Sequence, residues 1–242
     1  MKSVAIIPVF REIGKIGRVI ERFTPDSVDQ ICLIVDAPGQ EILGEIDAAK
    51  NRIDVPVTII QNPTRAGIGY AIKEGYKYAL SNNFGIIIVM AGNGKDDPRE
   101  IIRLTKPITM DGFDYVQGSR FLPGGIGGHT PFLRRTFTRL FPFAWTLLTG
   151  VRVTEVTNGF RAYRAEILRD PNINVWQDWL NGYELEYYLH YKVLTLGYKF
   201  TEKPVSKTYS HMGRTGYSHI SPLKDWNQIV TPVVLLRMGA RH

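Results

Sequence analysis

Short apolar runs rich in β-branched residues alternate with segments of helical spacing along the first half of the chain. The runs are VAIIPVF, ICLIVDA, VTIIQN and GIIIVMAG, and the segments between them include REIGKIGRVIERF and GIGYAIKEGYKYALSN. Near-continuous apolar strands that alternate with helices are typical of a parallel sheet with right-handed crossovers. We therefore predict an α/β fold, doubly wound, with a mostly parallel central sheet and helices on both faces.

Polar residues gather where each of these predicted strands ends. They occupy residues 8–12, 36–39, 62–69 and 91–97. Ligands of open α/β sheets bind outside the carboxyl ends of the strands. We therefore expect these four clusters to form one edge of the sheet and to hold the functional site.

The second half of the chain has a different pattern. DYVQGSRF predicts a strand, LPGGIGGHTP a mobile binding loop, and FLRRTFTRLFPFAWTLLTG a helix that Pro142 should kink or break. NGFRAYR predicts a short strand, NGYELEYYLHYKVLTLG a helix ended by Gly197, and KFTEKPVSKTYS a strand pair or an edge strand. We find no repeat and no linker, so we predict a single domain over residues 1–242.

Composition restricts the class of protein and its location. Hydrophobic residues make up 44% of the chain and charged residues 22%, as in globular proteins, and the net charge of +7 favours anionic partners or a merely basic surface. The single cysteine, Cys32, lies in a predicted core strand, which indicates a reducing compartment. The longest uncharged apolar run, residues 140–151, is too short for a bilayer. We expect a cytoplasmic protein that is soluble or peripheral at the inner face of the membrane.

Several residue types at the strand ends suit an anionic ligand. Asp36 follows a strand and can accept hydrogen bonds from a base or a ribose, although it can also cap the next helix. Gly67 and Gly69 allow a ligand to approach a helix N-terminus, or serve the turn alone. Arginine is the residue suited to bidentate phosphate contacts. Candidates of this kind are Arg120, Arg134, Arg135 and Arg214, whereas Arg161 suits a structural ion pair better.

Motifs run over nearly the whole chain in a definite order. IPVFREI keeps Pro8 and Glu12 of a Pro-x-Tyr-Asn-Glu opening, IVDAPGQ stands at an Asp-Asp-Gly-Ser turn, and NPTRAGIGYAIKEGYKYA has a matching Asn, Gly-x-Gly, Ala and Gly spacing. MAGNGKDDPREI stands where Asp-x-Asp precedes Asp-Pro, and GSRF, VTEVTNGFRAYRAEIL and RTGYSH follow. In this order the motifs resemble those of the inverting glycosyltransferases of family 2, of the dolichol-phosphate mannose synthase type.

The resemblance implies a GT-A-like fold and transfer of a sugar from a nucleotide-diphosphate sugar to a lipid phosphate or a glycan. It implies a nucleotide-sugar half over residues 1–118 and an acceptor half over residues 119–242. It assigns catalysis to Glu155, Arg120, Arg135 and Arg214, and acceptor binding to Glu184, Ser218 and His219. It assigns donor binding to Pro8, Val9, Glu12, Asp36, Asn62, Arg65, Gly67, Gly92, Asn93 and Lys95.

The chain departs from the family pattern where the family holds its divalent metal, Mg²⁺ or Mn²⁺. Asp-x-Asp is replaced by Ala91-Gly92-Asn93, and an amide oxygen is a far weaker ligand than two carboxylates. Other departures are Ala37 after Asp36, Arg11 for the Asn of the opening motif, and His219 for a terminal Lys.

Three interpretations of these departures remain open. In the first, protein cations such as Arg11 and Lys95 neutralise the diphosphate without a metal. In the second, a metal is held by Asp96 or Asp97, with Asn93 in support. In the third, the protein binds a ligand and catalyses nothing. We favour the first two together. Asp97 also suits a cap of the helix that starts at Pro98, which is a better interpretation than a metal ligand.

The nature of the acceptor decides whether a general base is needed. A lipid phosphate is already anionic, whereas a sugar hydroxyl needs a base. Candidate bases are Glu155, at the family's Asp position, and Glu184 or Glu186. Glu155 also suits a surface carboxylate that pairs with Arg152 or a neighbour.

The segment PFLRRTFTRLFPFAWTLL bears on the partner. Arginines beside Phe, Leu and Trp suit an anionic membrane surface, and the same pattern suits a helix packed on the core or a subunit interface. We favour the membrane or lipid-phosphate interpretation, with a membrane surface or a membrane partner protein as the expected partner. A basic nucleic-acid-binding module is the interpretation from another class, but we recognise no binding motif, and the strand-end clusters explain more residues.

Overall fold

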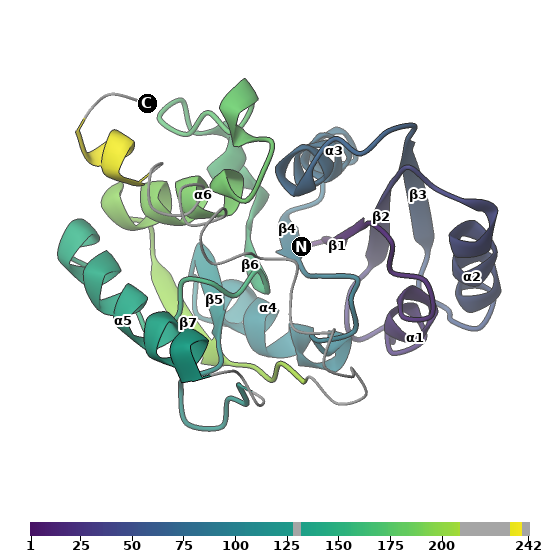
Figure 1. The fold of residues 1–242 in the computed structure, drawn as a ribbon, viewed down its shortest axis with the longest axis horizontal. Helices are drawn as coiled ribbons and strands as arrows, with labels where there is room; N and C mark the ends of the chain where they lie inside the picture. Colours follow the sequence, from purple (N-terminus) through teal and green to yellow (C-terminus); the bar gives the residue numbers. More distant parts are fainter. Residues whose placement is uncertain (128–131, 209–232, 239–242) are drawn as a thin grey trace.

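One seven-stranded sheet runs through the molecule. The computed structural model describes residues 1–127, 132–208 and 233–238, with backbone only for residues 132–139. The strand order is β3-β2-β1-β4-β6-β5-β7, from right to left in Figure 1. The strands are β1 (Ser3–Val9), β2 (Gln30–Asp36), β3 (Val57–Asn62), β4 (Ile86–Val89), β5 (Tyr115–Ser119), β6 (Arg161–Arg164) and β7 (Phe200–Pro204).

Six of these strands run in the same direction, and β6 is antiparallel to both of its neighbours. Because β6 runs against the others, it begins at the edge where they end. The residues before β6 therefore share this edge with the residues that follow each parallel strand. The predicted mostly parallel α/β sheet is confirmed.

Helices cover both faces of the sheet, as predicted. They are α1 (Ile16–Ile20), α2 (Gln40–Lys50), α3 (Ile68–Ser81), α4 (Ile101–Met110), α5 (Phe132–Thr149) and α6 (Glu184–Thr195), with 3-10 turns η1 (Pro98–Glu100), η2 (Ala165–Arg169) and η3 (Asp178–Leu180). Alternate residues of β1 enter two separate cores, because side chains of a strand point to opposite faces. One core contains α3 and α6, and the other contains α1, α2 and α4.

Helix α5 corrects one of the two outcomes predicted for Pro142, a break of the helix. The helix continues from Phe132 to Thr149 with Pro142 inside it. Its inner side is anchored by Trp145, which is 1% exposed and packs near Phe141 with ring centroids 5.6 Å apart. Packing against the core therefore outweighs the hydrogen bond that the proline removes. The prediction for the next helix holds, since α6 ends just before Gly197, whose φ of 78° is the left-handed conformation of a helix stop.

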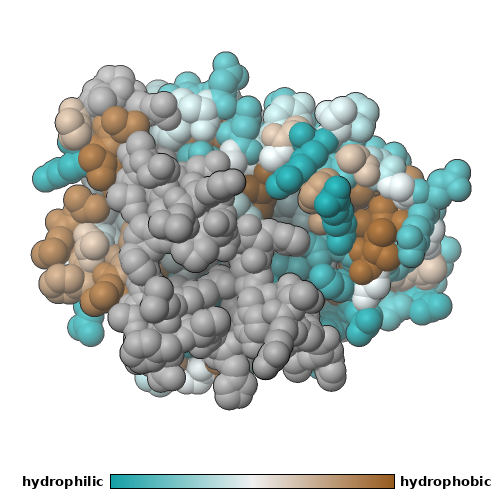
Figure 2. Space-filling view, viewed as in Figure 1, coloured by the Kyte–Doolittle hydropathy of each residue, from teal (hydrophilic) through white to brown (hydrophobic). Residues whose placement is uncertain are grey.

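The outer side of α5 carries apolar residues that face solvent. Leu140, Phe143 and Leu147 are 61%, 66% and 71% exposed. Figure 2 shows apolar surface gathered at the left of the molecule, over α5. Within the described ranges, no helix has both the length and the apolar character that a bilayer crossing requires.

Candidate active site

The predicted strand-end clusters meet at one edge of the sheet. Strands β1 and β2 end side by side, as do β2 and β3, and β1 lies directly beside β4. The strand order reverses between β1 and β4, which is the place where open α/β sheets bind ligands. Residues after β5 and β7, and residues 154–160 before β6, join the same edge from the second half of the chain.

Asp36 and Asn62 form a buried pair at the ends of β2 and β3. Asn62 Nδ2 donates to Asp36 Oδ1 at 2.8 Å, and the backbone N–H of Ala66 donates to Asp36 Oδ2 at 3.2 Å. Asp36 is 6% exposed. Gly39 stands at the N-cap of α2 with no side-chain cap, so Asp36 does not cap that helix. The carboxylate instead orders the loop that leads to α3.

Two arginines flank Phe10 beside this pair. The guanidinium carbon of Arg65 lies 4.6 Å from the centre of the Phe10 ring, and that of Arg11 lies 5.1 Å away. Arg11 and Ala37 both have left-handed backbone, with φ of 57° and 47°. That conformation costs a non-glycine residue of the order of 1 kcal/mol. Two cations, one from the loop after β1 and one from the loop after β3, thus meet at the Phe10 ring.

The glycines at the start of α3 make room for the chain itself, in line with the interpretation that they serve the turn. A Cβ on Gly67 would lie 2.4 Å from Asn181 O, and one on Gly69 would lie 2.4 Å from Leu180 O. Tyr70 N donates to Asn181 O at 3.1 Å. The N-terminus of α3 is therefore capped by the loop after η3, and that loop is what requires glycine.

The donor loop, which we define as residues 91–97, turns its polar side chains onto its own structure. Asn93 Oδ1 accepts from Lys95 N at 3.1 Å, and Asp96 Oδ2 accepts from Ala91 N at 3.3 Å. Asp97 accepts hydrogen bonds from both the backbone and the guanidinium of Arg99. Burial opposes ionisation of Asp97, but the bonds from Arg99 outweigh it and lower the pKa of Asp97. The capping interpretation of Asp97 thus matches the observed contacts.

Glu155 and Arg120 form a buried ion pair below the acceptor side of the edge. Arg120 Nε lies 2.6 Å from Glu155 Oε2, and the Thr157 backbone and hydroxyl both donate to Oε1 at 2.9 Å. Glu155 is 0% exposed, which excludes the alternative of a surface pair with Arg152. Burial opposes ionisation, but the Arg120 charge and the bonds from Arg120 and Thr157 lower the pKa of Glu155. A carboxylate held in this way is a poor proton acceptor.

A second layer that the sequence reasoning missed holds this pair in place. Both oxygens of Glu202 in β7 accept from Thr154 N, at 3.0 and 2.8 Å, and Oε1 accepts from Glu155 N at 2.9 Å. Asn158 is 0% exposed and donates to Gly118 O at 3.0 Å. Thr157 and Asn158 lie in the motif that contains Glu155, whereas Glu202 carries no local signal in its strand.

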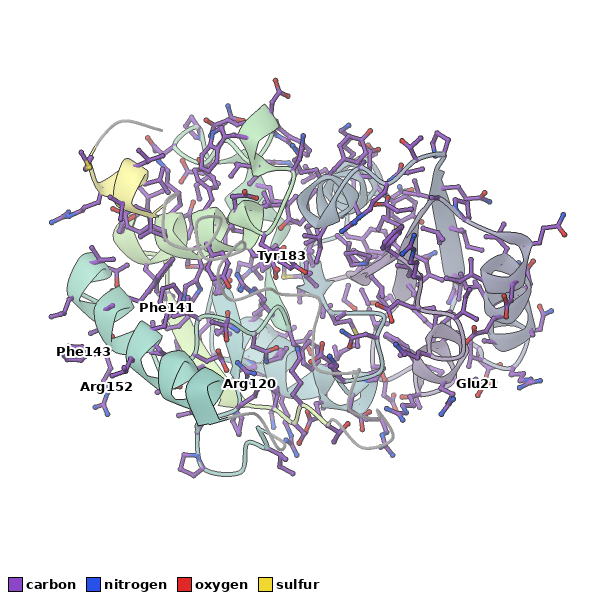
Figure 3. The ribbon with its side chains drawn as sticks, in the orientation of Figure 1. Glu21, Arg120, Phe141, Phe143, Arg152 and Tyr183 are labelled. Carbon is purple, nitrogen blue, oxygen red and sulfur yellow. The ribbon has the colours of Figure 1, made fainter. Side chains whose placement is uncertain are left out.

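An open cavity of about 860 Å³ lies between Arg120 and helix α5. Phe143 and Arg152 lie at the outer side of α5 in Figure 3. The residues that line the cavity include two arginines and several apolar side chains, so guanidinium groups lie next to apolar walls. Its lining consists of Arg120, Phe121, Leu122, Pro123, Gly124, Gly125, Pro142, Phe143, Thr146, Arg152, Val153 and Thr154.

Comparison with known proteins identifies the family. The sequence model described as "Glycosyl transferase family 2" matches residues 4–170, more than half of the chain. The chain belongs to glycosyl transferase family 2. The predicted family and the predicted class of enzyme, a glycosyltransferase, are both confirmed.

Curated relatives of this family 2 chain are named as polyprenyl-phosphate enzymes. The undecaprenyl-phosphate mannosyltransferase of Micrococcus luteus is 24% identical over 218 residues, which cover 90% of this chain and 88% of that protein. The polyprenol monophosphomannose synthase of Mycolicibacterium smegmatis is 24% identical over 213 residues, which cover 88% and 79%.

Solved structures of similar fold include glucosyl-3-phosphoglycerate synthase from Mycobacterium tuberculosis. Its complex with UDP has a TM-score of 0.67 and 16% identity, covering 98% of this chain and 80% of that one. Its complex with Mn²⁺, UDP-glucose and phosphoglyceric acid has a TM-score of 0.64 and 17% identity, with the same coverage. At this level of identity the likeness shows the fold alone.

The metal of the family pattern does not fit the residues of this family 2 site. The Asn93 side chain accepts a hydrogen bond from Lys95 N, and Asp97 forms an ion pair with Arg99. The Asp96 side chain is 0% exposed and forms an ion pair with Lys207. The described part of the chain contains no group of three or more His, Cys, Asp or Glu side chains that could hold a metal ion. Both carboxylates of the donor loop are thus paired with cations of the chain, and the Asp-x-Asp pair of the family pattern is replaced by Ala91-Gly92-Asn93.

The remaining predicted residues differ in what they can contact. Val9 is 1% exposed and belongs to the core. Gly92 packs against Ile7 and Ile16, and a Cβ there would lie 3.3 Å from each. Glu184 lies in the first turn of α6, beside Gly182. Pro8, Glu12 and Lys95 lie at the predicted edge; Arg214, Ser218 and His219 lie outside the described residues, as do the side chains of Arg134 and Arg135.

Proposed function

We propose that the protein is an inverting glycosyltransferase that moves a sugar from a nucleotide-diphosphate sugar to a polyprenyl phosphate. The family and the names of the two curated relatives support this proposal. The acceptor phosphate attacks the anomeric carbon in line with the departing diphosphate. The protein supplies orientation and charge stabilisation for this displacement.

The state of Glu155 is the observation that carries the choice of acceptor. A hydroxyl acceptor needs a base, and Glu155 is buried, paired with Arg120 and lowered in pKa. A phosphate acceptor needs no base, because its oxygen is already anionic. We therefore assign Glu155 the role of holding Arg120, and we assign Arg120 to the acceptor or the leaving phosphate.

The cavity beside α5 supports a lipid as the rest of the acceptor. Arg120 and Arg152 offer guanidinium groups to a phosphate, and Phe143 offers an apolar wall. The exposed residues Leu140, Phe143 and Leu147 continue this wall along the outside of the helix. An apolar helix side next to cations suits the headgroup boundary of an anionic membrane.

Loss of the metal ligands agrees with a donor site that works without a metal. Replacing two carboxylates by Ala91 and Asn93 removes two negative charges, the same change in net charge that one divalent ion brings. Arg11 and Arg65 beside Phe10 place fixed cations near the donor. Fixed cations stabilise a departing diphosphate without reorganisation. We assign the donor to this edge, with Asp36 and Asn62 on its nucleoside side.

Calorimetric titration of sugar nucleotides, with excess chelator and then with Mg²⁺ or Mn²⁺, tests the proposal. We expect binding of at least one UDP- or GDP-sugar, with an affinity that chelator leaves unchanged. Incubation of that donor with undecaprenyl phosphate should then give the glycosyl phospholipid, detected by mass spectrometry.

Two results would contradict the proposal in different ways. Failure of every sugar nucleotide to bind, with or without metal, would remove the transferase assignment. Binding without turnover on either polyprenyl phosphates or soluble glycans would favour a ligand-binding homologue that catalyses nothing.

A further inference from the structure

The segment that follows β7 lies between the donor loop and the loop after β5. Lys207 N donates to Ile126 O at 2.7 Å, and Thr208 N donates to Lys95 O at 3.0 Å. Ser206 N donates to Glu100 Oε2 at 2.7 Å. Backbone bonds on both sides therefore fix the position from which the Lys207 side chain extends.

The Lys207 ammonium joins the two halves of the site. Its Nζ lies 3.0 Å from Asp96 Oδ1 and 2.9 Å from Asn158 Oδ1. The Asp96 side chain is 0% exposed and that of Lys207 is 13% exposed. Asp96 also accepts from Ala91 N, at the position where the family pattern has its first metal-binding carboxylate. One cation is thus bonded to the donor loop at the place where metal ligands are missing.

We propose that Lys207 is the built-in cation of the donor loop and that it binds the donor diphosphate directly. An ammonium group has three N–H donors. Two of them go to Asp96 and Asn158, and no acceptor among the residues that the structure describes lies within hydrogen-bond distance for the third. The third N–H is therefore left for an anionic oxygen.

The charges around the loop favour this assignment. Asp96 pairs with Lys207 and Asp97 pairs with Arg99, so both carboxylates of the loop are already neutralised. A diphosphate that enters the loop then meets an ammonium N–H donor and no uncompensated negative charge. Because Lys207 is covalently part of the chain, chelation cannot remove it. The inference rests on the proposed function and names the residue that stands in for the metal.

Binding of UDP and GDP in the presence of chelator tests the role of Lys207. We choose the double variant Asp96→Asn/Lys207→Met, because removal of Lys207 alone would leave Asp96 buried without its counter-ion. Methionine keeps much of the side-chain length, and the neutral pair preserves packing without a change in net charge. Since one charge-assisted hydrogen bond to the diphosphate is lost, we expect affinity to fall roughly tenfold to hundredfold.

Matched variants separate a binding role from a structural one. Lys203→Met removes the same charge from the half-buried β7 residue that lies four positions earlier, and it should leave affinity unchanged. Lys207→Arg keeps a cation and should retain more affinity than the double variant. Thermal unfolding of each protein shows whether the fold is intact at the temperature of the titration.

The possible outcomes distinguish this inference from the proposed function. Wild-type affinity in the double variant would overturn the role of Lys207 and leave the transferase assignment standing, as would wild-type binding that requires Mg²⁺ or Mn²⁺. Absence of nucleotide binding by the wild-type protein in every condition would overturn both.

Discussion

Glu155 is an ionised carboxylate that has no contact with solvent. A charge that loses its hydration remains stable only when hydrogen bonds and an opposite charge replace the water. Arg120 and Thr157 supply both, at 2.6 to 2.9 Å. At the scale of single residues, substitution of either member of this pair should therefore lower the stability of the fold.

Glu155→Gln should destabilise the fold, because it leaves the Arg120 guanidinium buried without its counter-ion. We expect the free energy of unfolding to fall by about 3 kcal/mol or more near neutral pH. Denaturant unfolding measures this change. In the double variant Arg120→Met/Glu155→Gln, the loss should be smaller than the sum of the two single losses, since the two groups interact directly.

The same variant gives the expected pH dependence. The pKa of Glu155 is lowered from its ordinary 4.5 in the folded protein, so its stabilisation is complete above that value. As the pH falls below it, the unfolded chain takes up the proton first and the stabilisation is lost. The difference in unfolding free energy between wild type and Glu155→Gln should thus narrow in acid. A constant difference would contradict a charged Glu155.

Single residues could be predicted where their roles are local. The sequence around Asp97 indicates a helix cap, and the structure has Asp97 accepting from Arg99 N at 3.1 Å. The ion-pair partners of Glu155 and Asp96 lie 35 and 111 positions away along the chain. No local pattern encodes such pairs, because they depend on which strand ends meet.

At the scale of elements, the start of α3 depends on its contact with the loop after η3. Gly69 meets the carbonyl oxygens of Leu180 and Gly182, which a Cβ would approach to 2.4 and 2.5 Å. Real Cβ atoms do not come so close to backbone atoms. An added Cβ at position 69 would therefore force either the helix or the loop to move. The loop and the helix are therefore fitted to each other at this glycine.

Gly69→Ala should destabilise the protein by about 1–3 kcal/mol through overpacking. Gly44→Ala is the matched control, because Gly44 lies inside α2 and a Cβ added there would meet no neighbouring atom within 4 Å. That control should stabilise the protein by about 0.5–1 kcal/mol through helix propensity. Denaturant midpoints of both variants measure the contrast. Equal effects would contradict the close approach at Gly69.

Elements with strong periodicity could be predicted, and their pairing could not. The four apolar runs of the first half became β1 to β4, and the second half contains the expected strands and helices. The insertion of β6 between β4 and β5 depends on contacts far along the chain. Pro142 shows the opposite failure, since a local rule predicted a kink or a break, and the packed helix α5 does not break there.

At the scale of the whole molecule, charge and apolar surface act together. The chain has a net charge of +7, and the outer side of α5 exposes Leu140, Phe143 and Leu147. Cations attract the molecule to an anionic bilayer, and apolar side chains then enter the headgroup region. The contribution of charge to membrane binding responds to the salt concentration, and the apolar contribution responds to substitution of the exposed side chains.

Phe143→Ser/Leu147→Ser should reduce binding to anionic lipid vesicles by roughly tenfold or more. Each of these exposed side chains contributes about 1.5–3 kcal/mol to binding when the lipid buries it. Co-sedimentation with vesicles that contain phosphatidylglycerol measures the change. Added salt should weaken binding of both proteins, because it screens the attraction to the lipid headgroups.

The control carries equally exposed apolar residues on another helix. Ile102 and Met110 of α4 are 52% and 73% exposed, and Ile102→Ser/Met110→Ser should leave vesicle binding unchanged. Equal loss in both double variants would contradict a specific role of α5. A change in oligomeric state without a change in vesicle binding would instead assign the α5 side to a subunit interface.

The position of β6 has a consequence for how the chain is made. β4 and β5 belong to the first 119 residues, yet the strand that joins them is residues 161–164. A nascent chain that has not reached β6 therefore carries two strands with unpaired backbone edges, which are prone to wrong pairing. The ribosome must therefore deliver the residues up to Arg164 before β4 and β5 can be joined. The edge that holds the candidate active site, which needs residues on both sides of β6, can only form after β6 has been made.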